Sequence, residues 1–299
     1  MQKNQKLLMS LGALFCCALW GISTPIVKLG YAFVDETNVF SLILWAGVQF
    51  VIAGVLTILI VSLVTKKIAV LKKKSVGGAV LISLLQTVLQ YALLYIGLSN
   101  TTSVKGAILK STDVFFIMLI ASLIFRQEKL TFAKLISCAI GFSGIIIMNL
   151  SGLSFNFNLK GDGLVVLAIV AYSFSVVVTR IFTKDENPAV LCGYQMLFGG
   201  VVMLILGLLG GGKLQFVSLL PIILCLSVLY AVSYTLWTSL LKNNPASKVA
   251  IHSFMTPVFG VVFSAFMLNE ETGVATINLI VALILVCLGI IIWGKTSKD

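Results

Sequence analysis

Long apolar runs, each bounded by a few polar residues, make up almost the entire chain. Each run is close to the roughly 20 residues that an α-helix needs to cross a hydrocarbon core of about 30 Å. The runs are continuous and rich in Leu, Ile and Val, whereas strands of a membrane β-barrel alternate polar and apolar residues. The pattern predicts ten transmembrane helices, at residues 7–32, 38–64, 76–98, 103–125, 132–150, 162–183, 189–210, 217–241, 246–268 and 273–293.

The composition leads to the same conclusion. Of the 299 residues, 59% are apolar and 10% are charged, and the mean hydropathy is +1.11. A soluble domain has about a quarter charged residues, and no single globular core could bury so much apolar surface. These values exclude a soluble enzyme, a disordered chain and a secreted disulfide scaffold. They predict an all-α integral membrane protein.

The charged residues are distributed unevenly between the predicted loops. The 21 Lys and Arg residues concentrate in alternate loops, most densely at Lys66–Lys74. Cytoplasmic loops carry the excess of basic residues in membrane proteins, so the pattern predicts two cytoplasmic termini in a plasma (cell inner) membrane. We interpret Lys66–Lys74 as an orientation signal, with anionic lipid binding as the alternative. The excess of base then does not indicate nucleic acid.

The first apolar run, from about Leu7 to Tyr31, follows basic residues as a signal peptide would. It is longer than the apolar region of such a peptide. We therefore expect it to be a retained first helix.

The two halves of the chain share polar landmarks in the same order. Trp20–Lys28 (WGISTPIVK) parallels Tyr172–Arg180 (YSFSVVVTR), and Glu128 after the fourth span parallels Glu270 after the ninth. Five helices per half is an odd number, so the halves must have opposite orientations in the bilayer. Such inverted repeats are typical of secondary transporters, with the substrate site near the midplane.

These landmarks also resemble the EamA-type branch of the drug/metabolite transporter superfamily, over essentially the whole chain. The motifs that carry the resemblance are Trp20-Gly21 with Pro25 and Lys28, Gly161-Asp162, Ala246-Ser247 with Thr256-Pro257, and Leu268-Asn269-Glu270. The resemblance implies two inverted five-helix repeats, at residues 1–155 and 156–299. It also implies a carrier, commonly an exporter, of a small organic metabolite such as an amino acid or amine.

The fourth span departs from the family pattern. It carries Lys110 and Asp113 and lacks the usual Thr-Pro. A charged side chain at mid-membrane costs at least about 2.5–3.5 kcal/mol and normally faces a partner or a cavity. At i and i+3 the two residues share one helix face, so they either form an internal ion pair or line the central cavity. In the cavity they would bind the carboxylate and amine of a zwitterion, or exchange a proton.

The chain contains a single histidine. Aligning Glu128 with Glu270 places His252 at the position that Lys110 has in the other half. A group that titrates near neutral pH would suit proton coupling or substrate sensing there. The alternative is a hydrogen-bonded packing residue.

Aromatic side chains gather at mid-span positions. Tyr230, Tyr234 and Trp237 form one stripe on the eighth helix, and Trp20 and Tyr172 are the pair related by the repeat. Aromatic faces bind cations and stack on planar substrates, so we expect these residues to line the site. Helix packing is the alternative for all of them.

Two glutamines are further candidates. Gln86 and Gln90 fall one turn apart near the middle of the third helix. A buried amide in hydrocarbon needs a partner, so both are expected to face the protein interior. The partner is either the substrate or another helix.

The sequence lacks the motifs of metal sites and of ATP-driven transporters. The six cysteines lie inside apolar runs, and the one histidine leaves no zinc or iron ligand set. Without a Walker A sequence, ATP cannot drive the protein directly. We expect no cofactor or metal, a small-molecule substrate, the lipid bilayer as partner and a proton as the candidate coupling ion.

Two other functions are compatible with short stretches of the sequence. One is an intramembrane enzyme. Gly141-Phe142-Ser143-Gly144 is similar to the motif of rhomboid-type serine proteases, and His252 would be the candidate general base. A nucleotide-sugar or lipid-linked sugar carrier is the other alternative. Its diphosphate substrates would call for several intramembrane cations, and Lys110 is the clear candidate in this sequence. We expect the chain to be no enzyme.

Overall fold

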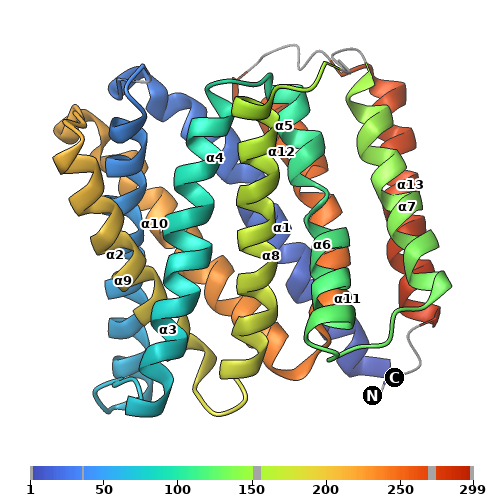
Figure 1. The fold of residues 1–299 in the computed structure, drawn as a ribbon, viewed down its shortest axis with the longest axis horizontal. Helices are drawn as coiled ribbons and strands as arrows, with labels where there is room; N and C mark the ends of the chain where they lie inside the picture. The colour runs from blue at the N-terminus through green and yellow to red at the C-terminus, as the bar shows by residue number, and fades with distance from the viewer. Residues whose placement is uncertain (1–2, 36, 151–155, 269–273, 297–299) are drawn as a thin grey trace.

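A computed structural model describes residues 3–35, 37–150, 156–268 and 274–296. In this part of the chain, helices run side by side along one direction as a bundle (Figure 1). Nine described helical segments are long and apolar enough to cross a membrane, and Phe132–Met148 is a shorter apolar helix. The prediction of an all-α membrane protein with ten spans is confirmed.

Most spans are single α-helices whose bounds agree with the predicted runs to within a few residues. They are α1 (Lys3–Gly30), α2 (Val39–Thr65), α7 (Phe132–Met148), α9 (Pro188–Leu209), α10 (Phe216–Asn243) and α13 (Thr276–Thr296).

The remaining spans change helix type along their length, which the apolar runs did not predict. The third comprises α3 (Val76–Ile82), the π-helical η3 (Ser83–Leu89) and α4 (Gln90–Leu98). The fourth comprises α5 (Ser103–Lys110), α6 (Asp113–Leu119) and the π-helical η4 (Ile120–Ile124). The sixth comprises the π-helical η6 (Leu159–Gly163) and α8 (Leu164–Phe182). The ninth comprises α11 (Ala246–Ala250), the 3₁₀-helical η7 (Ile251–Phe254) and α12 (Met255–Leu268).

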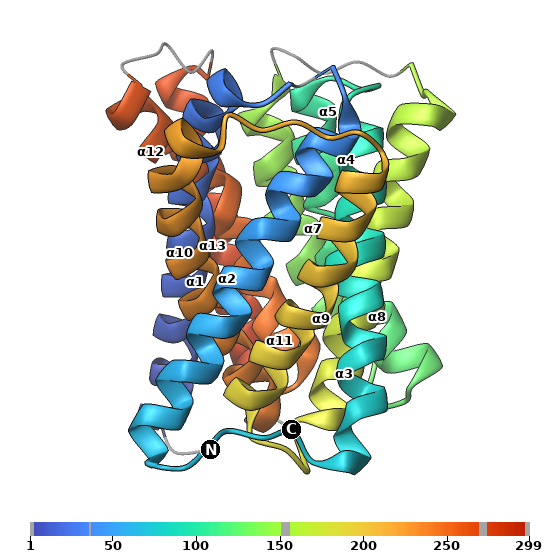
Figure 2. The same ribbon diagram turned by 90° about the vertical axis from the view of Figure 1, so that its left-hand side faces the viewer.

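The bundle is held together by helix pairs that join its two halves. Here the first half is the chain up to residue 150 and the second half the chain from residue 156. α2 packs along α9, α7 along α13, α1 against α10 and α12, and α4 against α8 (Figures 1 and 2). Between α2 and α9, a Cβ on Gly47 would lie 2.5 Å from the backbone nitrogen of Leu204. Glycine is needed here because the backbones approach so closely.

Burial separates a protein-facing interior from an apolar exterior. The largest buried cluster combines residues of α1, α6, α8, α10, α11 and η7, while Phe132 and Val217 expose most of their side chains. Exposed apolar residues of this kind suit contact with lipid. Both chain ends lie at the same end of the bundle (Figure 1), here called the terminal end, and the opposite end is called the distal end.

Candidate functional site

The candidate site lies where the interrupted fourth and ninth spans meet. Asp113 begins α6, directly after the two-residue break that follows α5, and Ser253 lies in the 3₁₀ turn η7 between α11 and α12. The Ser253 hydroxyl donates to the Asp113 carboxylate, at 3.2 Å from each of its oxygens. This contact joins the two halves through their irregular segments. Irregular backbone inside a membrane protein occurs where it is buried or lines a cavity.

The break in the fourth span has a local cause. The hydroxyl of Ser111 donates to the carbonyl of Ala107 at 3.0 Å, and that of Thr112 donates to the carbonyl of Leu109 at 2.6 Å. Hydroxyls that bond to the preceding turn bend helices. Two in succession fall at the break between α5 and Asp113.

The irregular turn in the ninth span follows from Pro257. Proline has no N–H to donate to the carbonyl four residues earlier, and its ring clashes with that carbonyl. The carbonyl concerned belongs to Ser253, which lies within η7. The proline therefore disrupts the helix at the residue that contacts Asp113.

Asp113 is a buried carboxylate with partners on three segments. Only 7% of the residue is exposed, and besides Ser253 it accepts the backbone N–H of Val114 at 2.7 Å. The Ser173 hydroxyl of α8 donates to its backbone carbonyl at 3.4 Å. The carboxylate also lies within electrostatic range of Lys110 and Tyr172. Such a carboxylate can bind an amine or a proton.

Lys110 is the last residue of α5, and its side chain is exposed. Its charge interacts with that of Asp113, but no ion pair joins these two residues in the described chain. The internal ion pair that the spacing allowed is therefore not formed.

The predicted aromatic residues gather on one side of this region. The Trp20 ring lies 4.9 Å from that of Trp237 and 5.5 Å from that of Tyr234, measured between centroids. The hydroxyls of Tyr234 and Tyr91 share a hydrogen bond of 3.0 Å. Tyr230 stacks on Phe50 at 5.7 Å. We call these six residues the aromatic cluster.

Tyr172 lies between the aromatic cluster and Asp113. It packs in the same buried core as Trp20 and Trp237, and its hydroxyl is within electrostatic range of Asp113 and of Tyr234. Of the residues that complete the site, Tyr91 and Phe50 were not predicted. Tyr91 follows Gln90 directly, so its position beside the predicted amides was a usable signal.

Several buried polar atoms beside the aromatic cluster lack a hydrogen-bond partner among the described residues. They are Nε1 of Trp20, Nε1 of Trp237 and Oε1 of Gln90. Gln86 is also buried, and it lies in the π-helical η3. Buried polar groups are normally paired, and π-helical turns are frequent at functional sites. Two donors and an acceptor are thus available to a polar ligand.

His252 directly precedes Ser253, but its ring lines a cavity that includes none of the site residues named above. Its Nδ1 is 3.2 Å from the carbonyl of Val249, and the buried ring lines a cavity of about 50 Å³ with Lys6, Lys248 and Trp293, at the terminal end. The repeat alignment that selected His252 also equates Ser111 with Ser253, its neighbour. That serine contacts Asp113, and the alignment could have identified it.

The residues considered for an intramembrane enzyme do not form a catalytic pair. The Ser143 hydroxyl donates to the carbonyl of Ile140 at 2.7 Å, within α7. The ring of His252 contacts the carbonyl of Val249. Each residue is thus bonded to the backbone of its own segment.

Ten membrane spans in two halves of opposite orientation, with interrupted helices that meet in the interior, define a class of membrane transporters. The model of the EamA-like transporter family matches residues 7–150 and 159–294. The chain belongs to this family. It is 25% identical to the uncharacterized transporter YvbV of Bacillus subtilis, over 95% of this chain and 90% of that protein. It is 24% identical to an uncharacterized transporter of Archaeoglobus fulgidus, over 86% and 89%.

The fold also occurs in a solved structure. A protein crystal structure superposes on this chain with a TM-score of 0.79, covers 100% of both chains and is 15% identical in sequence. The family and its relatives are transporters, which points away from an enzyme.

Proposed function

We propose that the protein is a secondary carrier for a small amine or amino acid, which it exports by alternating access. The observation that carries this proposal is the buried Asp113 carboxylate, bonded to Ser253 of the other half where two interrupted helices meet. In transporters, discontinuous helices bind the substrate between the repeats.

The chemistry around Asp113 favours a cationic or zwitterionic substrate. The carboxylate would bind an ammonium group, and Lys110 would bind a carboxylate on the same ligand. Trp20, Trp237 and Tyr234 offer aromatic faces. Such a face stabilises a desolvated cation by about 2 kcal/mol. The unpaired atoms of Trp20, Trp237 and Gln90 would supply hydrogen bonds.

A proton is the proposed coupling ion, because a single carboxylate cannot hold a proton and bind an ammonium group at the same time. Exchange of one for the other at Asp113 would couple proton entry to substrate exit. The titratable groups within electrostatic range of this carboxylate are Lys110, Tyr172, Cys17 and Cys138. We place the protein in the plasma membrane with both termini in the cytoplasm, in accordance with the loop charges.

Transport in proteoliposomes tests the proposal. A panel of amino acids, amines and nucleotide sugars is screened for counterflow, and the hit is measured for wild type and Asp113→Asn between pH 5.5 and 8. We expect the variant to lose at least about tenfold in rate and to lose the pH dependence, because it can neither titrate nor bind an ammonium group strongly.

The matched control is Asp35→Asn. Asp35 is an exposed loop carboxylate whose partners are the N–H and hydroxyl of Thr37. Its loss should leave the rate and the pH profile unchanged. Equal rates and equal pH profiles for wild type and Asp113→Asn would contradict the proposal.

A further inference from the structure

The fourth and ninth spans are each bonded, at their first residues, to a carboxylate from the other half of the chain. At the distal end, Asp162 of the second half holds the start of α5 in the first half. At the terminal end, Glu128 of the first half holds the start of α11 in the second half. The two anchors lie at opposite ends of the bundle, and each joins the halves beside one of the helices that forms the candidate site.

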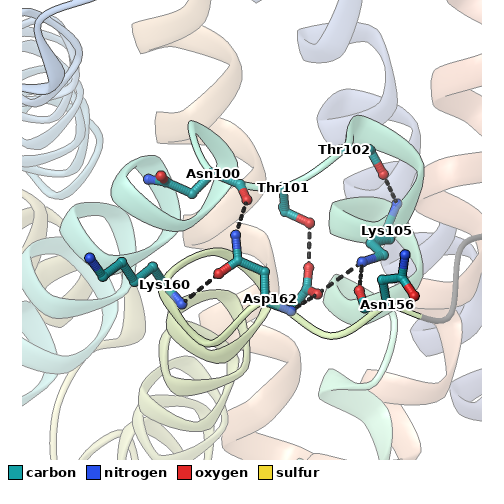
Figure 3. Close-up of polar contacts among 8 residues, drawn as sticks. Asn100, Thr101, Thr102, Lys105, Asn156, Lys160 and Asp162 are labelled. Carbon is teal, nitrogen blue, oxygen red and sulfur yellow. Dashed lines mark hydrogen bonds and ion pairs between the residues drawn. The ribbon is translucent and has the colours of Figure 1, made fainter.

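The distal anchor is a buried ion pair with additional hydrogen bonds (Figure 3). Lys105 Nζ lies 3.1 Å from Asp162 Oδ2, and the Thr101 hydroxyl donates to Oδ1. The backbone N–H of Asn158 donates to Oδ2 at 2.9 Å. The side chain of Asp162 is 3% exposed and that of Lys105 is 15% exposed, so the ion pair is largely shielded from water. The carboxylate thus bonds to both halves at once.

Two further contacts close the same end. The Asn158 amide donates to the carbonyl of Asn100 at 3.0 Å, and Lys105 Nζ also donates to the carbonyl of Asn156 (Figure 3). The segment before η6 is therefore fastened to the segment before α5.

The terminal anchor has the same design with different residues. Glu128 accepts the backbone N–H of Ser247 at 3.2 Å and the hydroxyl of the same serine. Lys134 Nζ lies 3.3 Å from Oε2 of this carboxylate, the oxygen that also accepts the Ser247 hydroxyl, and both side chains are at most 5% exposed. The adjacent Gln127 accepts a hydrogen bond of 2.8 Å from Arg180 of the second half. This turn therefore contacts α8 and α11 together.

These contacts are suited to being broken and remade. A packed apolar contact between halves would expose hydrocarbon to water when it opened, whereas a carboxylate, an ammonium and a hydroxyl are well hydrated once water reaches them. A pathway that opens at one end at a time has to part the halves at that end. The charged contacts that join the halves beside α5 and α11 are placed for this step.

We propose that the Asp162 anchor and the Glu128 anchor are the two closures of the transport pathway, which open in alternation. The inference rests on the proposed carrier function and assigns its two gates. Opening at the distal end requires Asp162 to release Thr101 and Lys105, and opening at the terminal end requires Glu128 to release Ser247.

Cross-linking each anchor distinguishes a gate from a static contact. In a background with the accessible thiols removed (Cys225→Ser, Cys287→Ser), the pairs Thr101→Cys with Asp162→Cys and Ser247→Cys with Glu128→Cys are oxidised in proteoliposomes. We expect oxidation of either pair to reduce transport to less than about a tenth of the rate of the same protein after reduction. The single-cysteine variants are the controls, and oxidation should leave their rates unchanged.

The outcomes separate this inference from the proposed function. If the reduced proteins transport and oxidation of the pairs leaves the rate unchanged, the anchors are static and the inference is wrong. If the unmodified protein transports no substrate of the panel, the proposed function fails instead.

A labelling experiment covers the case in which the double variants are inactive even when reduced. A Lys110→Cys reporter is labelled with a membrane-impermeant maleimide from either side of oriented vesicles. Asp162→Asn should raise labelling from the distal side, and Glu128→Gln should raise it from the terminal side, each severalfold. The matched controls Asp35→Asn and Asp185→Asn should leave labelling unchanged, and equal labelling in all variants would overturn the inference.

Discussion

At the scale of single residues, each of three buried carboxylates has several hydrogen-bond or ion-pair partners. Asp113 bonds to Ser253 and Val114, Asp162 to Thr101 and Lys105, and Glu128 to Ser247 and Lys134. A buried carboxylate is tolerated only with such partners. Each carboxylate therefore fixes the relative positions of the segments that it joins, because hydrogen bonds depend on direction and apolar packing does not.

Glu186, outside the spans, gives a prediction about acid stability. Burial raises the pKa of this carboxyl, but hydrogen bonds from the N–H groups of Asn187 and Lys72 outweigh burial, so the pKa lies below its usual value of 4.5. A lowered pKa in the folded state stabilises the fold at pH values above 4.5, and this contribution is lost as the pH falls further.

Glu186→Gln should therefore be less stable than wild type at pH 7, by about 1–2 kcal/mol. The difference should shrink as the pH falls below 4.5. Thermal unfolding in detergent across pH 3.5–8 measures it. The neighbouring Asp185→Asn removes an exposed carboxylate that is paired with Lys74 at 3.4 Å and should change little. A stability difference for Glu186→Gln that does not vary with pH would show that the lowered pKa of Glu186 does not stabilise the fold.

The residue scale also shows which parts of the site the sequence could predict. The stripe of Tyr230, Tyr234 and Trp237 follows from helical spacing, and the structure places all three in or beside one cluster with Trp20. The Ser253 contact with Asp113 joins residues far apart in the sequence. No local pattern reports such a contact, and only the repeat alignment connects these two segments.

At the scale of elements, the decisive features are the interruptions. Apolar runs predicted where each span lies, because a span needs a fixed length of hydrocarbon contact. They did not predict the breaks, because Ser111, Thr112 and the turn before Pro257 are short exceptions inside long apolar segments. Mean hydropathy is hardly changed by one or two polar residues or a proline, whereas each of them can change the backbone hydrogen bonds of the helix.

Replacement of Pro257 tests the role of the break in the ninth span. In Pro257→Ala, the restored N–H can donate to the Ser253 carbonyl, so η7 should become α-helical and draw Ser253 away from Asp113. Proline inside a helix costs about 3 kcal/mol relative to alanine. We therefore expect a variant that is at least as stable as wild type but transports about tenfold more slowly.

Thermal unfolding and proteoliposome flux are measured together on the same preparation. Pro221→Ala, in α10, removes a helix proline outside the interrupted spans and should leave the flux unchanged. A Pro257→Ala variant with the wild-type transport rate would show that the irregular turn has no role in the site.

At the scale of the whole molecule, the halves are interleaved along their length and fastened at both ends. The pairs α2 with α9 and α7 with α13 each join the first half to the second. The sequence predicted two halves because polar landmarks recur in order, and the boundary near residue 155 stays a prediction. It could not predict that Asp162 and Glu128 reach across to the other half, because that depends on how the halves pack.

Substrate binding is proposed to depend on Asp113, at the meeting point of the two interrupted spans. Its most direct test is the thermal stability of purified wild type and Asp113→Asn, each titrated with the substrate found by counterflow. A ligand that binds only the folded protein raises its apparent melting temperature. We expect a concentration-dependent rise of several degrees for wild type and none for Asp113→Asn. An equal rise for both proteins would contradict it.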